Sequence, residues 1–287
     1  MPQLTFEPVH ADFGARVKGV DLSEELPQSV IEEIHAAIDT YSFLCFADQS
    51  MSNERQLAFT KRLGEPEEEH VHYGMTGEKI FLGTVGNVID DKTIMGNDDA
   101  HSRYQKGNEM WHSDSSFRLV PSFVSITHAY EVPGEGGTTE FVSQRAAYER
   151  LPQEIKTTID PLLVLHDYVF SRSKVAPVDP NHAASLPPIE NRLVRTNPSN
   201  GRKNYYVGSH ARSIVGWSGV ASRELIDDLL QRATRTQDIY SHQWQVGETV
   251  IWDNRCLLHR GGGYDADGWR RRMQQTRVRG TGPTIDE

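Results

Sequence analysis

Apolar residues recur at helical spacing in three parts of the chain and predict amphipathic helices there. The first covers 27–41, where Pro27 suits a first helical turn. The second follows Ser52, a favourable N-cap residue, and ends before Gly64. The third covers 222–233, and two shorter helices are expected at 143–150 and from there to about 159. Helices are therefore present, but they account for less than half of the chain.

Short apolar or alternating runs between turn residues predict β-strands. They lie at 4–20, 42–46, 122–130, 138–142, 205–207, 249–252 and 272–278. Gly247 and Glu248 predict a hairpin turn before the strand 249–252. Many short strands with few helices indicate a mainly β fold, a jelly-roll-like double sheet with flanking helices.

Two stretches show no periodicity. Residues 87–109 are polar and predict a long loop, which we interpret as a lid because long loops in compact domains tend to be functional. Residues 177–191 are rich in proline and are expected to be irregular. We assign an insert at about 143–235 to the same domain, so that 1–287 forms one domain.

The composition excludes several classes of protein. A formal net charge of −10 and a pI near 5.6 argue against a nucleic-acid binder, which would carry a basic surface. No apolar run is long enough for a membrane span, and the N-terminus lacks the pattern of a signal peptide. Two cysteines, Cys45 and Cys256, do not form a disulfide framework. We expect a soluble cytoplasmic protein that binds neither nucleic acid nor membrane.

Candidate chemistry begins at His112 and Asp114, two residues apart. On a strand these side chains would point to the same face, so an imidazole and a carboxylate would converge. They make two thirds of the 2-His-1-carboxylate ligand set of non-haem Fe(II) oxygenases, with His259 far downstream as the candidate third ligand. The spacing alone is a weak signal, because His10 and Asp12 share it. The pair His70 and His72 offers another metal motif, although a solvated loop is the favoured interpretation.

Longer motifs give a family resemblance. Three stretches resemble, in order and spacing, the taurine and phenoxyacetate dioxygenase family (TauD/TfdA): 111–114, 136–139 and 252–260. The resemblance runs from about Gly14 to about Arg277 and is strongest to the aryloxyalkanoate dioxygenases. It implies a cupin-type double-stranded β-helix, Fe(II), 2-oxoglutarate as cosubstrate and O2. It also implies an iron site made by His112, Asp114 and His259.

The resemblance also places the cosubstrate. The distal carboxylate of 2-oxoglutarate needs a cation, for which a bidentate arginine is suited, and the segment 269–273 lies where the family has one. We prefer Arg271, with Arg270 as the alternative, and accept Arg272 as a surface residue. By the same resemblance, Thr139 donates its hydroxyl to that carboxylate.

The substrate is less well defined by the sequence. Candidate contacts are Asn108, His210 and Arg277; the last lies two residues beyond Gln275, where the family has a second arginine. We expect residues 252–255 to contact His259 from behind and hold its ring in place, although Asp253 could equally be an acidic residue of a loop.

We predict hydroxylation of a small anionic substrate, an aryloxyalkanoate cleaved to a phenol, with a sulfonate or another carboxylate as the close alternative. A zinc hydrolase and a non-catalytic jelly-roll binding module are the more distant hypotheses. The family resemblance also favours a homo-oligomer.

Overall fold

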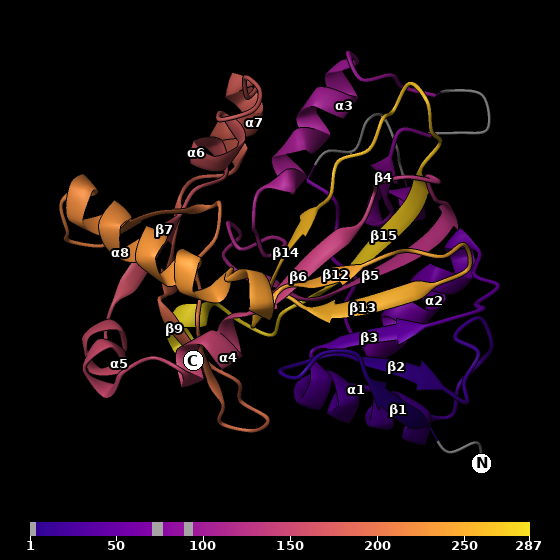
Figure 1. Ribbon diagram of the computed structural model, residues 1–287, viewed down its shortest axis with the longest axis horizontal. Helices are drawn as coiled ribbons and strands as arrows, with labels where there is room; N and C mark the ends of the chain where they lie inside the picture. The colour runs from indigo at the N-terminus through magenta and orange to yellow at the C-terminus, as the bar shows by residue number, and fades with distance from the viewer. Residues whose placement is uncertain (1–3, 71–76, 89–93) are drawn as a thin grey trace.

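The computed structural model describes residues 4–70, 77–88 and 94–287, and it is built around two sheets (Figure 1). The larger has the strand order β1-β2-β3-β13-β5-β15-β4. Its strands are β1 (Thr5–Pro8), β2 (Ala15–Lys18), β3 (Phe43–Phe46), β13 (Thr249–Asp253), β5 (Ser122–Glu131), β15 (Arg272–Arg279) and β4 (Gly83–Gly86). All neighbouring pairs are antiparallel except β2 and β3. Strands from both ends of the chain therefore lie side by side in its centre.

Two helices cover one face of this sheet, as their periodicity predicted. Helix α1 (Gln28–Tyr41) and helix α2 (Asn53–Leu63) bury Ile31, Ile34 and Phe59 against Leu44 and Ile251 of the sheet. The hydroxyl of Ser52 accepts a hydrogen bond from the Arg55 amide, which confirms the predicted N-cap.

The smaller sheet packs on the other face of the large one. Its order is β12-β6-β14, with β12 (Tyr240–His242), β6 (Thr139–Ser143) and β14 (Leu257–Gly261). One apolar cluster joins the two sheets: Phe141 and Leu257 of the small sheet pack with Phe43, Val250 and Met273 of the large one. The space between two sheet faces is thus the core, and one end of that space becomes the site described below.

The segment between β6 and β12 forms a separate lobe on the small sheet (Figure 1). Its helices are α4 (Gln144–Glu149), α5 (Gln153–Ile159), α6 (Tyr168–Arg172), α7 (Pro180–Ser185) and α8 (Gly219–Ala233). Its strands form the sheet β11-β7-β8 (Ala211–Ile214, Leu163–His166, Ile189–Arg192) and the pair β9 and β10 (Val194–Thr196, Lys203–Tyr205). Ile226 and Leu229 of α8 pack in one cluster with Val142 and Leu258 of the small sheet.

Some local predictions were wrong. Residues 177–191, expected to be irregular, contain α7 and the start of β8, because Asp179 caps a helix that begins with Pro180. The stretch 87–109 contains α3 (Ala100–Gln105) and a 3-10 turn, η2 (Lys106–Glu109); both are too short and polar to show an apolar period. The turn at Gly247 makes no hairpin, since it carries the chain from β12 in one sheet to β13 in the other. No helix among the described residues is both long and apolar enough to cross a bilayer.

Candidate active site

His112 and His259 are brought together by the backbone. Each residue's amide donates to the other's carbonyl, at 3.0 and 2.9 Å, in an isolated antiparallel bridge that extends the small sheet beyond β14. Their ring centroids lie 4.2 Å apart. His112 and His259, which lie far apart in the sequence, thus present their imidazoles at one point.

Asp114 completes the group. Its Oδ1 lies 3.7 Å from Nε2 of His112 and 3.7 Å from Nε2 of His259. Its Oδ2 faces away and accepts hydrogen bonds from Ser125 Oγ at 2.6 Å and from Gln275 Nε2 at 2.8 Å. One carboxylate oxygen is therefore held by the protein, while the other points at both histidine nitrogens.

The predicted convergence of His112 and Asp114 is confirmed, but the strand that was expected to cause it is not there. Only His112 makes a bridge, and Asp114 lies in a turn. Hydrogen bonds from side chains hold this segment in place of strand pairing. Ser113 Oγ donates to the Leu257 carbonyl, and Asn254 Oδ1 accepts from the Asp114 amide.

The charge states suit a divalent metal. Burial lowers the pKa of His259 to about 3 and also lowers the pKa of His112, so both rings are neutral at neutral pH. Burial alone would raise the pKa of Asp114, but His259, Arg277 and His112 together with the Ser125 hydrogen bond hold it well below its usual value. The group therefore offers two neutral nitrogens and one anionic oxygen.

The surroundings fix the ligand atoms that face the centre. His112 Nδ1 lies 2.7 Å from the Met110 carbonyl, so Nδ1 carries the proton and Nε2 is left with a free lone pair. Asn254 donates to Ser125 and accepts from Trp252 Nε1, which ties the Asp114 support to β13. Of the four residues expected to support His259, Asp253 instead pairs with Arg255 on the side away from the site.

The ligand atoms of His112, Asp114 and His259 all lie within 4.8 Å of one another and open onto a pocket. Three ligands on one side with an open opposite side fit an iron-oxygenase centre, not a closed structural metal site.

A second group within the same distance limit, Cys45, His242 and Glu248, fits a metal poorly. Burial and Glu248 raise the pKa of the Cys45 thiol, and Arg16 already neutralises Glu248 at 3.1 Å.

The deep end of the pocket holds a buried cation. Arg271 is 7% exposed, lies over the Tyr264 ring, and its Nε has no hydrogen-bond partner among the described residues. Burial lowers the pKa of Arg271 to about 10, since no carboxylate of the described residues offsets the desolvation of the guanidinium. Glycine is needed at position 86, because a Cβ there would lie 2.1 Å from the Arg271 carbonyl oxygen. Arg270, the alternative, is exposed and pairs with Glu131 at 2.5 Å. The arrangement thus supports Arg271 as the anion-binding residue.

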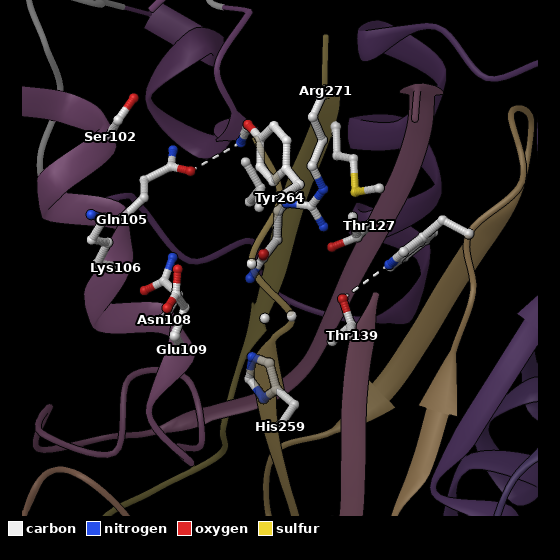
Figure 2. A pocket seen from close by; sticks show the side chains of 18 of the residues that line it. Ser102, Gln105, Lys106, Asn108, Glu109, Thr127, Thr139, His259, Tyr264 and Arg271 are labelled. Atoms are coloured by element: carbon white, nitrogen blue, oxygen red, sulfur yellow. Dashed lines mark hydrogen bonds between the residues drawn. The ribbon is translucent and has the colours of Figure 1, made fainter. Parts of the chain in front are cut away.

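Thr139 lies in the same part of the pocket (Figure 2). Its Oγ1 accepts a hydrogen bond from Trp244 Nε1 at 2.9 Å, which leaves the hydroxyl hydrogen free to point elsewhere. A buried guanidinium and an oriented hydroxyl together make a place for a carboxylate.

The opposite wall comes from the stretch that was predicted to be a lid. Residues of α3 and η2, including Gln105, Lys106 and Asn108, line the pocket (Figure 2). Gln105 fixes this wall to β4, because its side chain accepts from the Gly86 amide and donates to the Thr84 carbonyl. Residues 89–93 of the predicted lid lie outside the described residues, as does His72 of the second histidine pair.

The three predicted substrate residues have different outcomes. Asn108 lines the pocket. His210 is buried behind His112, with ring centroids 6.3 Å apart, and bonds Ser116 instead of lining the pocket. Arg277 is also outside the lining, held by Glu67 at 3.3 Å and Glu69 at 2.5 Å. The strand face of Arg277 was predicted correctly, but its carboxylate partners from 65–69 draw it away from the cavity.

Several lining residues were missed by the sequence reasoning, notably Lys106, Thr127 and Trp244. A signal existed for one of them. In the predicted strand 122–130, Ser125 and Thr127 are polar positions on one face, alternating with the apolar Val124 and Ile126.

Known proteins resemble the chain over nearly its whole length. The family described as "Taurine catabolism dioxygenase TauD, TfdA family" matches residues 5–277. An alpha-ketoglutarate-dependent 2,4-dichlorophenoxyacetate dioxygenase of Cupriavidus pinatubonensis is 34% identical over 94% of this chain and 96% of the relative. An (S)-phenoxypropionate/alpha-ketoglutarate-dioxygenase of Sphingobium herbicidovorans is 32% identical over 97% and 96%. The solved structure of AAD-2 in complex with Mn(II) and N-oxalylglycine superposes with a TM-score of 0.90 and 34% identity, covering 99% of this chain and 100% of the other.

Proposed function

Because the chain belongs to the taurine catabolism dioxygenase TauD, TfdA family, we propose that it is an Fe(II)- and 2-oxoglutarate-dependent dioxygenase that hydroxylates an aryloxyalkanoate. The substrate class follows from the two relatives that act on phenoxyacetates and phenoxypropionates. We infer that the two facing sheets form the double-stranded β-helix that this membership implies, and that 1–287 is one domain; the apolar cluster between the sheets supports this.

One observation carries the proposal. The free Oδ1 of Asp114 and the Nε2 atoms of His112 and His259 face one another at the open side of a pocket whose far end holds the buried Arg271. These residues would hold iron at the near end and 2-oxoglutarate between the metal and Arg271, with Thr139 as a further donor. When bound, iron, 2-oxoglutarate and O2 supply the oxidising chemistry that hydroxylates a C–H bond with release of succinate and CO2.

The chain's own residues prepare the site for that chemistry. Ser125 and Gln275 keep the carboxylate of Asp114 oriented, and the Met110 carbonyl keeps the proton of His112 on Nδ1. Trp252, Met273 and Tyr264 line the pocket with apolar surface that excludes water from the reacting atoms. Hydroxylation of the carbon next to the ether oxygen gives a hemiacetal, which breaks down to a phenol and a carbonyl compound.

Lys106 supports an anionic substrate. Because Arg277 lies outside the pocket, the lining that the structure describes contains one lysine, Lys106, and one arginine, Arg271. Arg271 is assigned to the cosubstrate, so we assign Lys106, exposed on the helical wall, to the carboxylate of the substrate. The wall made by 94–109 then acts as the lid over the substrate.

The test is a substrate panel. Phenoxyacetates, phenoxypropionates and sulfonates are assayed for succinate release coupled to formation of the phenol or the sulfite. Turnover of phenoxyalkanoates at least as fast as sulfonates is the expected result, and exclusive turnover of sulfonates contradicts the substrate class.

An anaerobic titration tests the reaction class. Fe(II) and 2-oxoglutarate added together should give a visible charge-transfer band. If no band forms and zinc supports hydrolysis, the chain is a zinc hydrolase; if neither activity nor O2 consumption occurs, it is a binding module. A homo-oligomer and a cytoplasmic location remain predictions, which sedimentation and cell fractionation check.

A further inference from the structure

Thr127 has a buried hydroxyl that lines the pocket. The residue is 2% exposed, and its Oγ1 has no hydrogen-bond partner among the described residues. A buried hydroxyl without a partner costs free energy of about 1–3 kcal/mol. Such groups are rare in native proteins, and one that lines a pocket has an explanation if a ligand supplies the partner.

Thr127 lies near the end of the pocket where we place the cosubstrate. It lies on β5 opposite Gln275 of β15, two residues beyond Ser125, which holds Asp114. Met273 and Gln275 of β15 and Arg271 just before it are alternate residues that line the pocket, so this face runs from the metal ligands to the buried guanidinium. Figure 2 shows the Thr127 hydroxyl on the same side of the pocket as Arg271 and Thr139.

The donors present there match one carboxylate. An ionised carboxylate has about four acceptor positions on its two oxygens. Arg271 supplies N–H groups, and Thr139 supplies one hydroxyl hydrogen because its oxygen already accepts from Trp244. Thr127 adds a second hydroxyl, which bonds to nothing else in the described part of the chain. The three side chains come from three different strands or strand ends and line one pocket, where Figure 2 shows them on the same side.

Resting on the proposed function, we propose that Thr127 donates a hydrogen bond to the distal carboxylate of 2-oxoglutarate, as a third donor beside Arg271 and Thr139. Thr127 thereby helps the site to distinguish 2-oxoglutarate from 2-oxo acids that lack a second carboxylate.

Anaerobic binding tests the proposal without turnover. The Fe(II) protein is titrated with 2-oxoglutarate and, separately, with pyruvate, which shares the chelating end but has no distal carboxylate. Thr127→Val, which keeps the shape, is expected to weaken binding of 2-oxoglutarate about tenfold, the usual effect of losing a hydrogen bond to a charged group. Its affinity for pyruvate should stay unchanged. Thr127→Ser, which keeps the hydroxyl, should bind 2-oxoglutarate nearly as the unmodified protein does.

Thr276→Val is the matched control, because Thr276 is a buried threonine on β15 whose hydroxyl pairs with Thr60. It should leave the affinity for 2-oxoglutarate unchanged. Equal affinity of the Thr127→Val and unmodified proteins for 2-oxoglutarate overturns the assignment, and so does an equal loss for pyruvate. If the unmodified protein binds no 2-oxoglutarate, the proposed function fails as well, so the two failures are distinguishable.

Discussion

The two walls of the pocket differ in burial and in what fixes their side chains. The sheet wall, made by β5, β6, β14 and β15, presents buried groups: His259 and Thr139 from strands, and Arg271 from the residue just before β15. The helical wall, made by α3 and η2, presents the exposed Lys106 and Glu109 and the half-buried Asn108. Strands fix ligand geometry more rigidly than a short polar helix does. This contrast fits the proposed function, in which the sheet wall holds metal and cosubstrate and the helical wall contacts the substrate.

The largest effect should come from the three proposed metal ligands, of which His259 lies on the sheet wall. Replacing His112, Asp114 or His259 by Ala should weaken Fe(II) binding more than about 100-fold, because changes in outer support alone cost 10–100-fold. Coupled succinate release should be abolished. Metal titration and a succinate assay measure both effects.

His10 offers a matched control for these variants, since it shares the His-x-Asp spacing and lies in a surface turn with Asp12. His10→Ala should be fully active. Full activity in any one of the three ligand variants instead removes that residue from the site.

The next largest effect separates the two neighbouring arginines. Arg271→Met should weaken 2-oxoglutarate binding about 100-fold or more, because the distal carboxylate would be buried without its cation. Arg270→Met should change it less than about twofold, since the exposed pair with Glu131 contributes little. Anaerobic titration of the charge-transfer band measures both. The reverse ranking would mean that the strand register, and with it the sheet-wall assignment, is wrong.

A smaller effect is expected on the helical wall. Lys106→Met should raise KM for a phenoxyacetate about two- to fivefold, the range for an exposed charge pair, with unchanged affinity for 2-oxoglutarate. Lys106→Arg, which keeps the charge, should stay close to the unmodified enzyme. Steady-state kinetics with each cosubstrate varied in turn measures the split. A loss of 2-oxoglutarate affinity in Lys106→Met would contradict the division of labour between the walls.

The last prediction is about stability, not activity, and concerns the support behind the sheet wall. Glu248 accepts from the Gln245 amide and from Arg16, and it contacts His242, whose ring packs on Trp244. Burial would raise the pKa of Glu248, but the hydrogen bond with His242 and the other partners lower it to about 2. The pKa of Glu248 is therefore lower in the folded protein than in the unfolded chain, where it is 4.5. The ionised carboxylate stabilises the fold above pH 4.5, and this stability is lost as the pH falls toward 2.

Glu248→Gln should therefore lower the free energy of unfolding by about 1–3 kcal/mol at pH 7 and flatten its decline between these pH values. Urea unfolding across that pH range is the measurement. An unchanged acid slope would show that Glu248 is not the titrating group.

The sequence by itself determined the parts of this protein that depend on local pattern and on motif order. The helices α1 and α2 follow from apolar periodicity and a serine cap, and a mainly β fold follows from many short strands. His112, Asp114 and His259 could be proposed because their motifs occur in the order that the family shows. Local spacing carries this information because it sets which side chains share a face.

Only the tertiary structure decided which groups meet. It separated the buried Arg271 from the exposed Arg270, which pairs with Glu131, and it took Arg277 out of the pocket by pairing it with carboxylates from 65–69. It also showed that Thr127, an ordinary β-former by sequence, has a hydroxyl with no partner among the described residues. Alternation along a strand gives the direction of a side chain, but its partners come from distant segments, and burial and pairing exist only once those segments have packed.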